Sequence, residues 1–312
     1  EEIIAKKLKF YVINASAVAR DAGMGSRINT ILQTCFFAIS GILSKEDAIT
    51  RIKDAIRKTY SDKGEKVVLK NFEAVDQAIA NLHEIDYSNY SVGSIAYEKA
   101  VPDEAPDFVK NVLAKILSFE GDELPVSAFP VDGVYPVATT KWEKRNIADT
   151  VPVWDMDLCS QCGKCFIICP HAAIRCKVYD KEELAGAPAT FLHTGPIGKE
   201  FNKETEAYTL QVSVEDCTGC KLCVEYCPIE SKAIPGHKAI NMQDQLPLKA
   251  AEKQNWDFFL TLPEIDRNRM NRNTVKGSQL LQPLFEFSGA CSGCGETPYL
   301  KLLTQLFGDR MV

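Results

Sequence analysis

The chain has 312 residues and a formal net charge of −6, and 46% of its residues are hydrophobic. That length predicts two or three domains with a substantial core, and the acidic balance excludes a surface built for nucleic acid. No apolar run could span a membrane and no signal peptide is seen, so the twelve cysteines point to a reducing cytoplasm.

Residues 1–118 alternate strand and helix signals. A short strand is predicted at residues 8–14, L-K-F-Y-V-I-N, which are aromatic and β-branched. The following G-M-G-S at residues 23–26 lacks the third glycine of a dinucleotide-binding turn. We therefore favour a tight strand-to-helix turn, while a phosphate-bearing ligand at that helix N-terminus stays open.

Helical spacing dominates the next hundred residues. Apolar residues between positions 28 and 39 predict a well-buried helix. Ser44 is expected to cap a second helix, with Asp47 at its third position. A short strand is predicted at residues 65–70, E-K-V-V-L-K, followed by a helix that begins at Asn71.

A further helix is predicted over residues 107–118, and the composition then changes. Residues 119–153 contain prolines that break any long helix, so a linker or small irregular domain is expected. These prolines are Pro125, Pro130, Pro136 and Pro152.

Two cysteine runs follow, C-S-Q-C-G-K-C-F-I-I-C-P and C-T-G-C-K-L-C-V-E-Y-C-P. Both have the spacing C-x2-C-x2-C-x3-C-P, which is typical of bacterial proteins with two [4Fe–4S] clusters. In that motif the fourth cysteine of each run ligates the other cluster. The spacing predicts cluster one on Cys159, Cys162, Cys165 and Cys227, and cluster two on Cys217, Cys220, Cys223 and Cys169.

Residues in and after the runs are expected to support the clusters. Gly163 and Gly219 lie between ligands, where amides are expected to approach sulfide closely. An apolar pair follows each run, residues 173–174 and residues 233–234, and is expected to shield cluster sulfur from water.

Other interpretations of the cysteines are weaker. Zinc sites use C-x2-C pairs with a longer gap and no third cysteine at i+6, and disulfides suit an oxidising compartment. His171 and His193 are expected on the surface or in loops, because thiolates already fill the sites. Cys35 and Cys176 have apolar neighbours and are expected to be small core residues.

The chain after residue 245 carries two further features. A basic stretch predicts a solvated face or a site for a phosphate or carboxylate. Its cations are Arg267, Arg269, Arg272 and Lys276. Cys291 and Cys294, in F-S-G-A-C-S-G-C-G-E-T-P-Y, form only half of a metal site.

Four blocks, taken in order, resemble the central portion of pyruvate:ferredoxin oxidoreductase, also called pyruvate synthase or pyruvate:flavodoxin oxidoreductase. Residues 25–37, G-S-R-I-N-T-I-L-Q-T-C-F-F, are similar to the end of its gamma-like domain. K-W-E-K-R-N at residues 141–146 resembles its EKR domain, and the cysteine runs resemble its ferredoxin domain. Residues 273–299 resemble the opening of its thiamine diphosphate domain.

The resemblance implies a multidomain fold of α/β and α+β parts. Its first part is the C-terminal portion of an α/β gamma-like domain (residues 1–118), followed by an irregular EKR linker domain (119–153). A bacterial-type 2[4Fe–4S] ferredoxin-like domain (154–245) and the truncated start of an α/β thiamine diphosphate domain (246–312) complete the chain.

The family oxidatively decarboxylates pyruvate with coenzyme A to acetyl-CoA and CO2, and passes electrons through [4Fe–4S] clusters to ferredoxin or flavodoxin. For this chain the resemblance implies that the eight cysteines of the two runs hold the medial and distal clusters. Cys291 and Cys294 would be two of the four ligands of a proximal cluster.

The resemblance also implies what lies elsewhere. No catalytic residue is expected in this chain, because residues 308–310 are Gly-Asp-Arg and not the Gly-Asp-Gly of a thiamine site. Thiamine diphosphate, Mg2+ and the pyruvate contacts are expected in the remaining parts of the same enzyme, which is typically a homodimer. Two alternatives stay open: a stand-alone two-cluster electron carrier, and an oxidoreductase for another 2-oxoacid.

Overall fold

A computed structural model describes residues 2–25, 27–93 and 99–311. The chain divides into two compact units, Glu1–Tyr97 and Glu98–Val312. Of the helices in the described residues, none combines the length and apolar composition that a membrane crossing requires.

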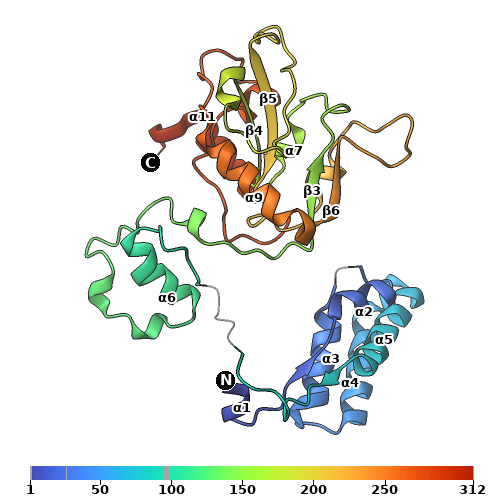
Figure 1. Ribbon diagram of the computed structural model, residues 1–312. Coiled ribbons are helices and arrows are strands. Elements are labelled where there is room, and N and C mark those ends of the chain that lie inside the picture. The colour runs from blue at the N-terminus through green and yellow to red at the C-terminus, as the bar shows by residue number, and fades with distance from the viewer. Residues whose placement is uncertain (1, 26, 94–98, 312) are drawn as a thin grey trace. The chain divides into compact units, whose positions relative to one another are not determined.

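The first unit is mainly helical, with one short antiparallel strand pair (Figure 1). Helices α3, α4 and α5 pack on one another, and α2 packs on α3 and α5. The strands are β1 (Tyr11–Val12) and β2 (His83–Glu84). The helices are α1 (Glu2–Ala5), α2 (Ala15–Asp21), α3 (Asn29–Ser40), α4 (Lys45–Tyr60) and α5 (Glu65–Ala80), with a 3-10 turn η1 (Ser61–Lys63) before α5.

The strand predicted at residues 65–70 is wrong, because these residues open helix α5. Gly64, with a φ of 93°, ends the preceding turn and precedes the helix. Val68 and Val75 are both 0% exposed and pack in one core cluster of this unit. Burial along a helical face outweighs the β propensity of two adjacent valines, so the helix predicted from Asn71 begins earlier, at Glu65.

Helix α3 is buried on one face only, so the expectation of a well-buried helix holds for that face alone. Ile31 is 0% exposed, whereas Leu32 and Phe36 are 45% and 56% exposed. The G-M-G-S turn joins α2 to α3 and not a strand to a helix, and its last residue, Ser26, lies outside the described residues.

Two local predictions are confirmed. Ser44 Oγ accepts a hydrogen bond from the Asp47 N–H at 3.1 Å and caps α4. The helix predicted over residues 107–118 is present as a π-helical turn η2 (Val109–Leu113) followed by α6 (Ala114–Leu117).

The proline-containing stretch is irregular up to residue 149, as expected, but Pro152 lies within the first strand of two antiparallel pairs. Its short 3-10 turns are η3 (Gly121–Glu123), η4 (Val126–Ala128) and η5 (Thr140–Trp142). The strands that follow are β3 (Thr150–Trp154), β4 (Ile174–Asp180), β5 (Glu206–Val212) and β6 (Ile240–Asp244).

The strand pairing gives the second unit a two-fold repeat. Strand β3 pairs with β6, so that Trp154 lies opposite Ile240. Strand β4 pairs with β5, so that Ile174 lies opposite Val212. Each cysteine run therefore connects a strand of one pair to a strand of the other, and each contains one short helix: α7 (Lys164–Ile167) or α8 (Leu222–Glu225).

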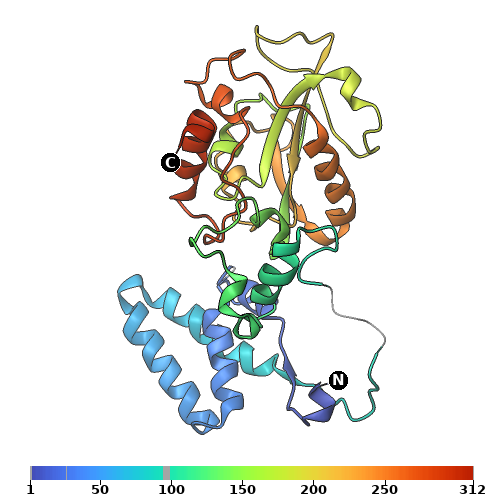
Figure 2. The same cartoon turned by 90° about the vertical axis from the view of Figure 1, so that its left-hand side faces the viewer.

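Further helices flank these two strand pairs. Figure 2 shows α9 (orange) on one side of the strands and α11 (red) on the other. Helix α9 contacts β5, and α10 contacts both α7 and α11. These elements are α9 (Gln245–Thr261), α10 (Val275–Gln279) and α11 (Thr297–Phe307), with 3-10 turns η6 (Lys181–Leu184) and η7 (Gly308–Arg310).

Candidate metal centres

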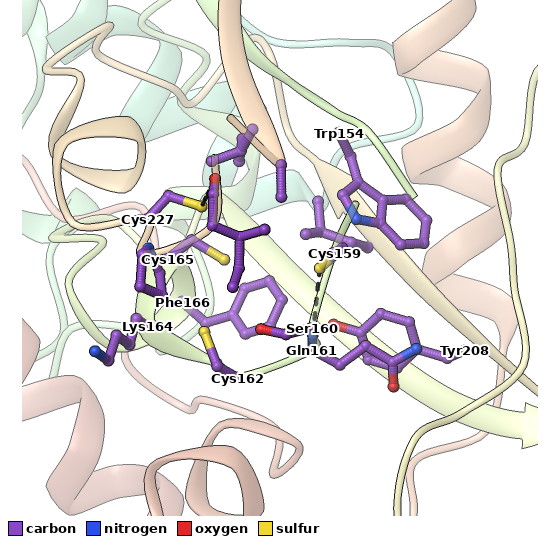
Figure 3. Close-up of a pocket in the computed structure, with 16 residues that line it drawn as sticks. Trp154, Cys159, Ser160, Gln161, Cys162, Lys164, Cys165, Phe166, Tyr208 and Cys227 are labelled. Atoms are coloured by element: carbon purple, nitrogen blue, oxygen red, sulfur yellow. Dashed lines mark hydrogen bonds between the residues drawn. The ribbon is translucent and has the colours of Figure 1, made fainter. Parts of the chain in front are cut away.

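Three cysteines of the first run share a cavity with the last cysteine of the second run. Figure 3 shows the four side chains around one space, and apolar side chains form part of the cavity wall. The four are Cys159, Cys162, Cys165 and Cys227. The wall includes Trp154, Phe166, Tyr208, Leu210 and Ile240.

A second cavity repeats this arrangement with the roles of the runs exchanged. It is lined by Cys217, Cys220 and Cys223 together with Cys169 from the first run. Apolar side chains complete it, among them Pro152, Ile174, Val212, Leu222 and Met242. The structure thus brings together the same two groups of four cysteines that the spacing predicts, and their ligation of clusters stays a prediction.

The backbone of the two runs repeats as well. Gln161 and Gly219 occupy equivalent positions, with φ values of 54° and 65°. Each donates its backbone N–H to the Sγ of the first cysteine of its run, Cys159 or Cys217, at 3.4 Å. Such amide hydrogen bonds stabilise a negatively charged sulfur, and they are one of the factors that set the potential of an iron–sulfur centre.

The two glycines between the cysteines make room for neighbouring backbone. A Cβ on Gly163 would lie 3.2 Å from the Cα of Lys276, and a Cβ on Gly219 would lie 3.1 Å from the Thr150 carbonyl oxygen. Both glycines also have positive φ, where a side chain adds strain. The close approach seen in the structure is to other segments of this chain, whereas the sequence suggested an approach to sulfide.

The chemistry of each cavity fits an iron–sulfur cluster. Burial raises the pKa of the Cys217 thiol to about 12 and raises the pKa of Cys165 and Cys223 as well. Thiolates in such surroundings need a nearby positive charge, and iron prefers soft sulfur donors. In the part of the chain that the structure describes, no three His, Cys, Asp or Glu side chains converge as ligands of a single ion would.

The apolar pair predicted after the second run is wrong. Residues 173–174 are buried and line the second cavity as expected, but Ile234 of the pair 233–234 is 57% exposed. Residues 239–240 are buried in their place and line the first cavity. Residues 230–238 form an insertion whose two ends pair in an antiparallel β-bridge. Because of this insertion, the apolar pair of the second repeat comes later in the sequence than that of the first.

His171 lies in a turn, as expected of a loop residue, but it is buried and not on the surface. It is 2% exposed, and its Nδ1 lies 3.1 Å from the carbonyl oxygen of Ser288. The carbonyl oxygen of His171 accepts the Phe287 N–H at 2.8 Å. The two segments are 117 positions apart in the chain, so local sequence carries no sign of this contact. His193 is exposed, as predicted.

The two isolated cysteines are core residues, as predicted. Cys35 and Cys176 are each 6% exposed. Burial raises the pKa of Cys176 to about 12, and its Sγ donates weakly to the carbonyl oxygen of Gln279 at 3.8 Å.

The basic side chains after residue 266 bind carbonyl and carboxylate groups of this same chain. Arg269 forms an ion pair with Glu206, with an Nη1–Oε1 distance of 2.5 Å. Arg267 donates to the carbonyl oxygen of Leu306 at 2.6 Å, and Lys276 Nζ contacts the carbonyl oxygen of Ile197. Arg267, Arg269 and Lys276 are therefore bound by other groups of this chain and do not form a solvated face. The carboxylate that the stretch binds is that of Glu206.

The Cys291–Cys294 turn lies against the second cysteine run. Ser292 Oγ donates to the Thr218 carbonyl oxygen at 3.3 Å, and a Cβ on Gly293 would lie 3.7 Å from the Cβ of Cys220. Backbone N–H groups at the start of α11 lower the pKa of Cys294. This half-site therefore adjoins the second cavity.

Lys301 is a functional candidate that the sequence reading missed. It lies on α11 and is 2% exposed. Its Nζ donates to the carbonyl oxygens of Phe166, Ile167 and Cys169, and burial lowers its pKa to about 8. The only sequence signal is a lysine among the apolar residues of this helix.

Comparisons with known families agree with the order of these parts. The family described as pyruvate ferredoxin/flavodoxin oxidoreductase matches residues 2–81. A family named EKR, described as a domain of unknown function, matches residues 94–148. Two 4Fe–4S binding domains match residues 151–174 and 210–231.

Curated relatives match the chain along its whole length. It is 55% identical to a putative pyruvate-flavodoxin oxidoreductase of Synechocystis sp. over 100% of this chain. It is 54% identical to a pyruvate-flavodoxin oxidoreductase of Nostoc sp. over 100% of this chain, and 49% identical to a pyruvate:ferredoxin oxidoreductase of Moorella thermoacetica over 99%. The match covers 26% of each relative, so the chain spans about a quarter of their length.

Proposed function

We propose that this chain is the electron-transfer part of a larger enzyme. It belongs, as a segment, to the pyruvate:ferredoxin and pyruvate:flavodoxin oxidoreductases. The whole enzyme would oxidatively decarboxylate pyruvate with coenzyme A to acetyl-CoA and CO2. Electrons would leave through this segment to ferredoxin or flavodoxin. Iron–sulfur clusters, when bound, supply the one-electron redox chemistry.

The observation that carries the proposal is the exchange of Cys169 and Cys227 between the two cavities. It gives each cavity four sulfur donors, which is the full ligand set of a [4Fe–4S] cluster. The protein's own contribution is to hold the thiols, to direct the amides of Gln161 and Gly219 at sulfur, and to exclude water with apolar walls.

We further propose an order for the sites. Cys291 and Cys294 would be two of four ligands of a third cluster, and their turn lies against Cys220 of the second set. Electrons would enter from that side, reach the second set and continue to the first set, to which it is joined by the short segment from Cys165 to Cys169. Thiamine diphosphate with Mg2+, the pyruvate contacts and a homodimer interface would belong to the remaining parts of the enzyme.

The test is iron and sulfide analysis of the anaerobically purified protein, combined with EPR. Two complete ligand sets within this chain should hold about eight irons, and the reduced clusters should interact magnetically. Zinc in place of iron, or a single cluster, would contradict the proposal.

Two other functions are considered, a stand-alone electron carrier and an oxidoreductase for another 2-oxoacid. A stand-alone electron carrier is disfavoured because relatives several times longer match the whole chain. Another 2-oxoacid in place of pyruvate would be revealed by comparing rates of substrate-dependent ferredoxin reduction across 2-oxoacids.

A further inference from the structure

The block K-W-E-K-R-N, residues 141–146, lies in a region whose family description assigns no function. Two consecutive cations of this block contact the residues that directly precede Cys217 and Cys291. Lys144 Nζ lies 2.5 Å from the Oδ2 of Asp216, the residue before Cys217. Arg145 Nη1 donates at 2.9 Å to the carbonyl oxygen of Ala290, the residue before Cys291.

The contact of Lys144 is a partly buried ion pair, in which the Lys144 side chain is 34% exposed. The Asp216 side chain is 2% exposed, and its Oδ2 also accepts a hydrogen bond from Ser213 Oγ at 2.5 Å. Lys144 Nζ lies 4.9 Å from the ring centroid of Phe287, which belongs to the segment leading to Cys291. A cation placed between a buried carboxylate and an aromatic ring ties both segments to the block.

Two further hydrogen bonds to backbone carbonyl oxygens connect the same segments. The Asn146 N–H donates to the Glu215 carbonyl oxygen at 2.8 Å. Thr140 Oγ1 donates to the Glu286 carbonyl oxygen at 3.1 Å. Residues 140–146 thus bond both to the start of the second cysteine run and to the segment before the Cys291–Cys294 turn.

We infer that residues 140–146 act as a clamp that holds the Cys291–Cys294 half-site at a fixed position against the Cys217 run. The inference rests on the proposed function, since electron transfer between the two sites gives the fixed separation its purpose. Tunnelling rates fall steeply with distance, so a loosened turn would slow transfer without removing either site.

The test compares Arg145→Ala and Lys144→Met with Lys141→Ala in the anaerobically purified holoprotein. Lys141 is an exposed cation of the same block whose ammonium lies over the Trp142 ring, 5.2 Å from its centroid. Hydrogen exchange across residues 286–294 and the EPR interaction between reduced clusters are the readouts. Arg145→Ala should speed exchange there roughly fivefold, the effect of one lost hydrogen bond, and weaken the interaction.

The control variant should leave both readouts unchanged. Unchanged exchange and unchanged interaction in both Arg145→Ala and Lys144→Met would overturn the clamp. If the unsubstituted protein lacks a third cluster, the proposed third site fails, whereas hydrogen exchange still decides on the clamp.

A second inference rests on Lys301, whose contacts are independent of this block. Its three acceptors are carbonyl oxygens at and just after the C-terminal end of α7, where backbone partial charges are negative. The acceptors lie beside Cys165, of the first set, and include the carbonyl of Cys169, of the second set. A buried ammonium needs compensating negative charge, and thiolates of both sets would supply it.

We propose that Lys301 keeps a positive charge next to both cysteine sets. This charge would raise the reduction potentials of both clusters. Reduction adds negative charge to a cluster, and a nearby cation in a low-dielectric interior favours the reduced form. This inference also rests on the proposed function.

The test is an EPR-monitored redox titration of the holoprotein with Lys301→Met and Lys301→Gln. Both variants should lower the midpoint potentials of both clusters, because both remove the charge, and the glutamine keeps hydrogen-bond donors for the carbonyls. Lys164→Met is the matched control, because Lys164 neighbours Cys165 but is exposed and screened by solvent.

Native potentials in Lys301→Gln would overturn the proposal and assign the residue a hydrogen-bonding role. Loss of both clusters in every Lys301 variant would likewise overturn it in favour of a purely structural role. Absence of clusters from the unsubstituted protein would instead count against the proposed function.

Discussion

Cys169 and Cys227 are the two residues that link the cysteine runs. Each is the fourth cysteine of its run, and each lines the cavity formed by the first three cysteines of the other run. A proline follows each of them, fixes φ and removes an N–H, which helps the chain to turn away.

Replacing one of these cysteines should disturb the distant set. In Cys227→Ala we expect the cluster of Cys159, Cys162 and Cys165 to be lost or altered, while Cys169→Ala should affect the cluster of Cys217. EPR and iron content of the two variants measure this, with Cys35→Ala as a control in the first unit. Loss of the cluster of its own run in each variant would contradict the pairing.

The Glu206–Arg269 ion pair gives the fold a pH dependence. The Arg269 guanidinium beside Glu206 lowers the pKa of that carboxyl, whose side chain is 5% exposed. A lowered pKa stabilises the fold above the unfolded value of about 4.3, and the stabilisation is lost as pH falls through the folded value.

Glu206→Gln should therefore reduce stability at neutral pH and weaken its dependence on pH below about 5. Because Arg269 is partly exposed, we expect a loss of about 1 kcal/mol. Chemical denaturation of the protein and the variant between acid and neutral pH measures this. Equal stability of the two proteins at neutral pH would show that solvent fully screens the pair.

Elements of the second unit meet through close backbone approaches. The turn before α7 packs on α10 because Gly163 has no side chain, and the turn of the second run packs on β3 at Gly219. In the first unit the same kind of burial turns residues 65–70 into a helix despite their adjacent valines. Packing between elements decides local structure at both places.

Gly163→Ala should be more destabilising than Gly186→Ala. Both glycines have φ near 80°, so both substitutions cost about 1 kcal/mol of backbone strain. Only at Gly163 would the new Cβ meet neighbouring backbone, since nothing lies within 4 Å at Gly186. Thermal unfolding compares the variants, and equal melting temperatures would show that α10 moves aside without cost.

At the scale of the whole molecule, the candidate metal sites are part of the core of one unit. Cys223 belongs to the largest buried cluster of the second unit, with Trp154 and Tyr208, and five other run cysteines pack against it. The cores of the first unit contain Cys35 but none of these eight residues. Metal binding is therefore expected to stabilise the two units unequally.

Removing iron with a chelator under oxidising conditions should loosen the second unit selectively. Hydrogen exchange is expected to rise in β3 and β6 and to stay unchanged in α3 and α5. Exchange that rises equally in both units would contradict this, and a chelator-treated sample reconstituted with iron and sulfide is the control.

The sequence by itself determined the two cysteine sets, the core positions of Cys35 and Cys176, the cap at Ser44 and the family. These features follow from spacing within short motifs, and the cysteine motif itself specifies that the fourth cysteine of each run joins the other set. Only the tertiary structure decided that residues 239–240 shield the first cavity, that His171 is buried, and that Lys144, Arg145 and Lys301 reach the cysteine sets. Those contacts join residues far apart in the chain or follow an insertion, and their free energy comes from burial and charge pairing that no local pattern encodes.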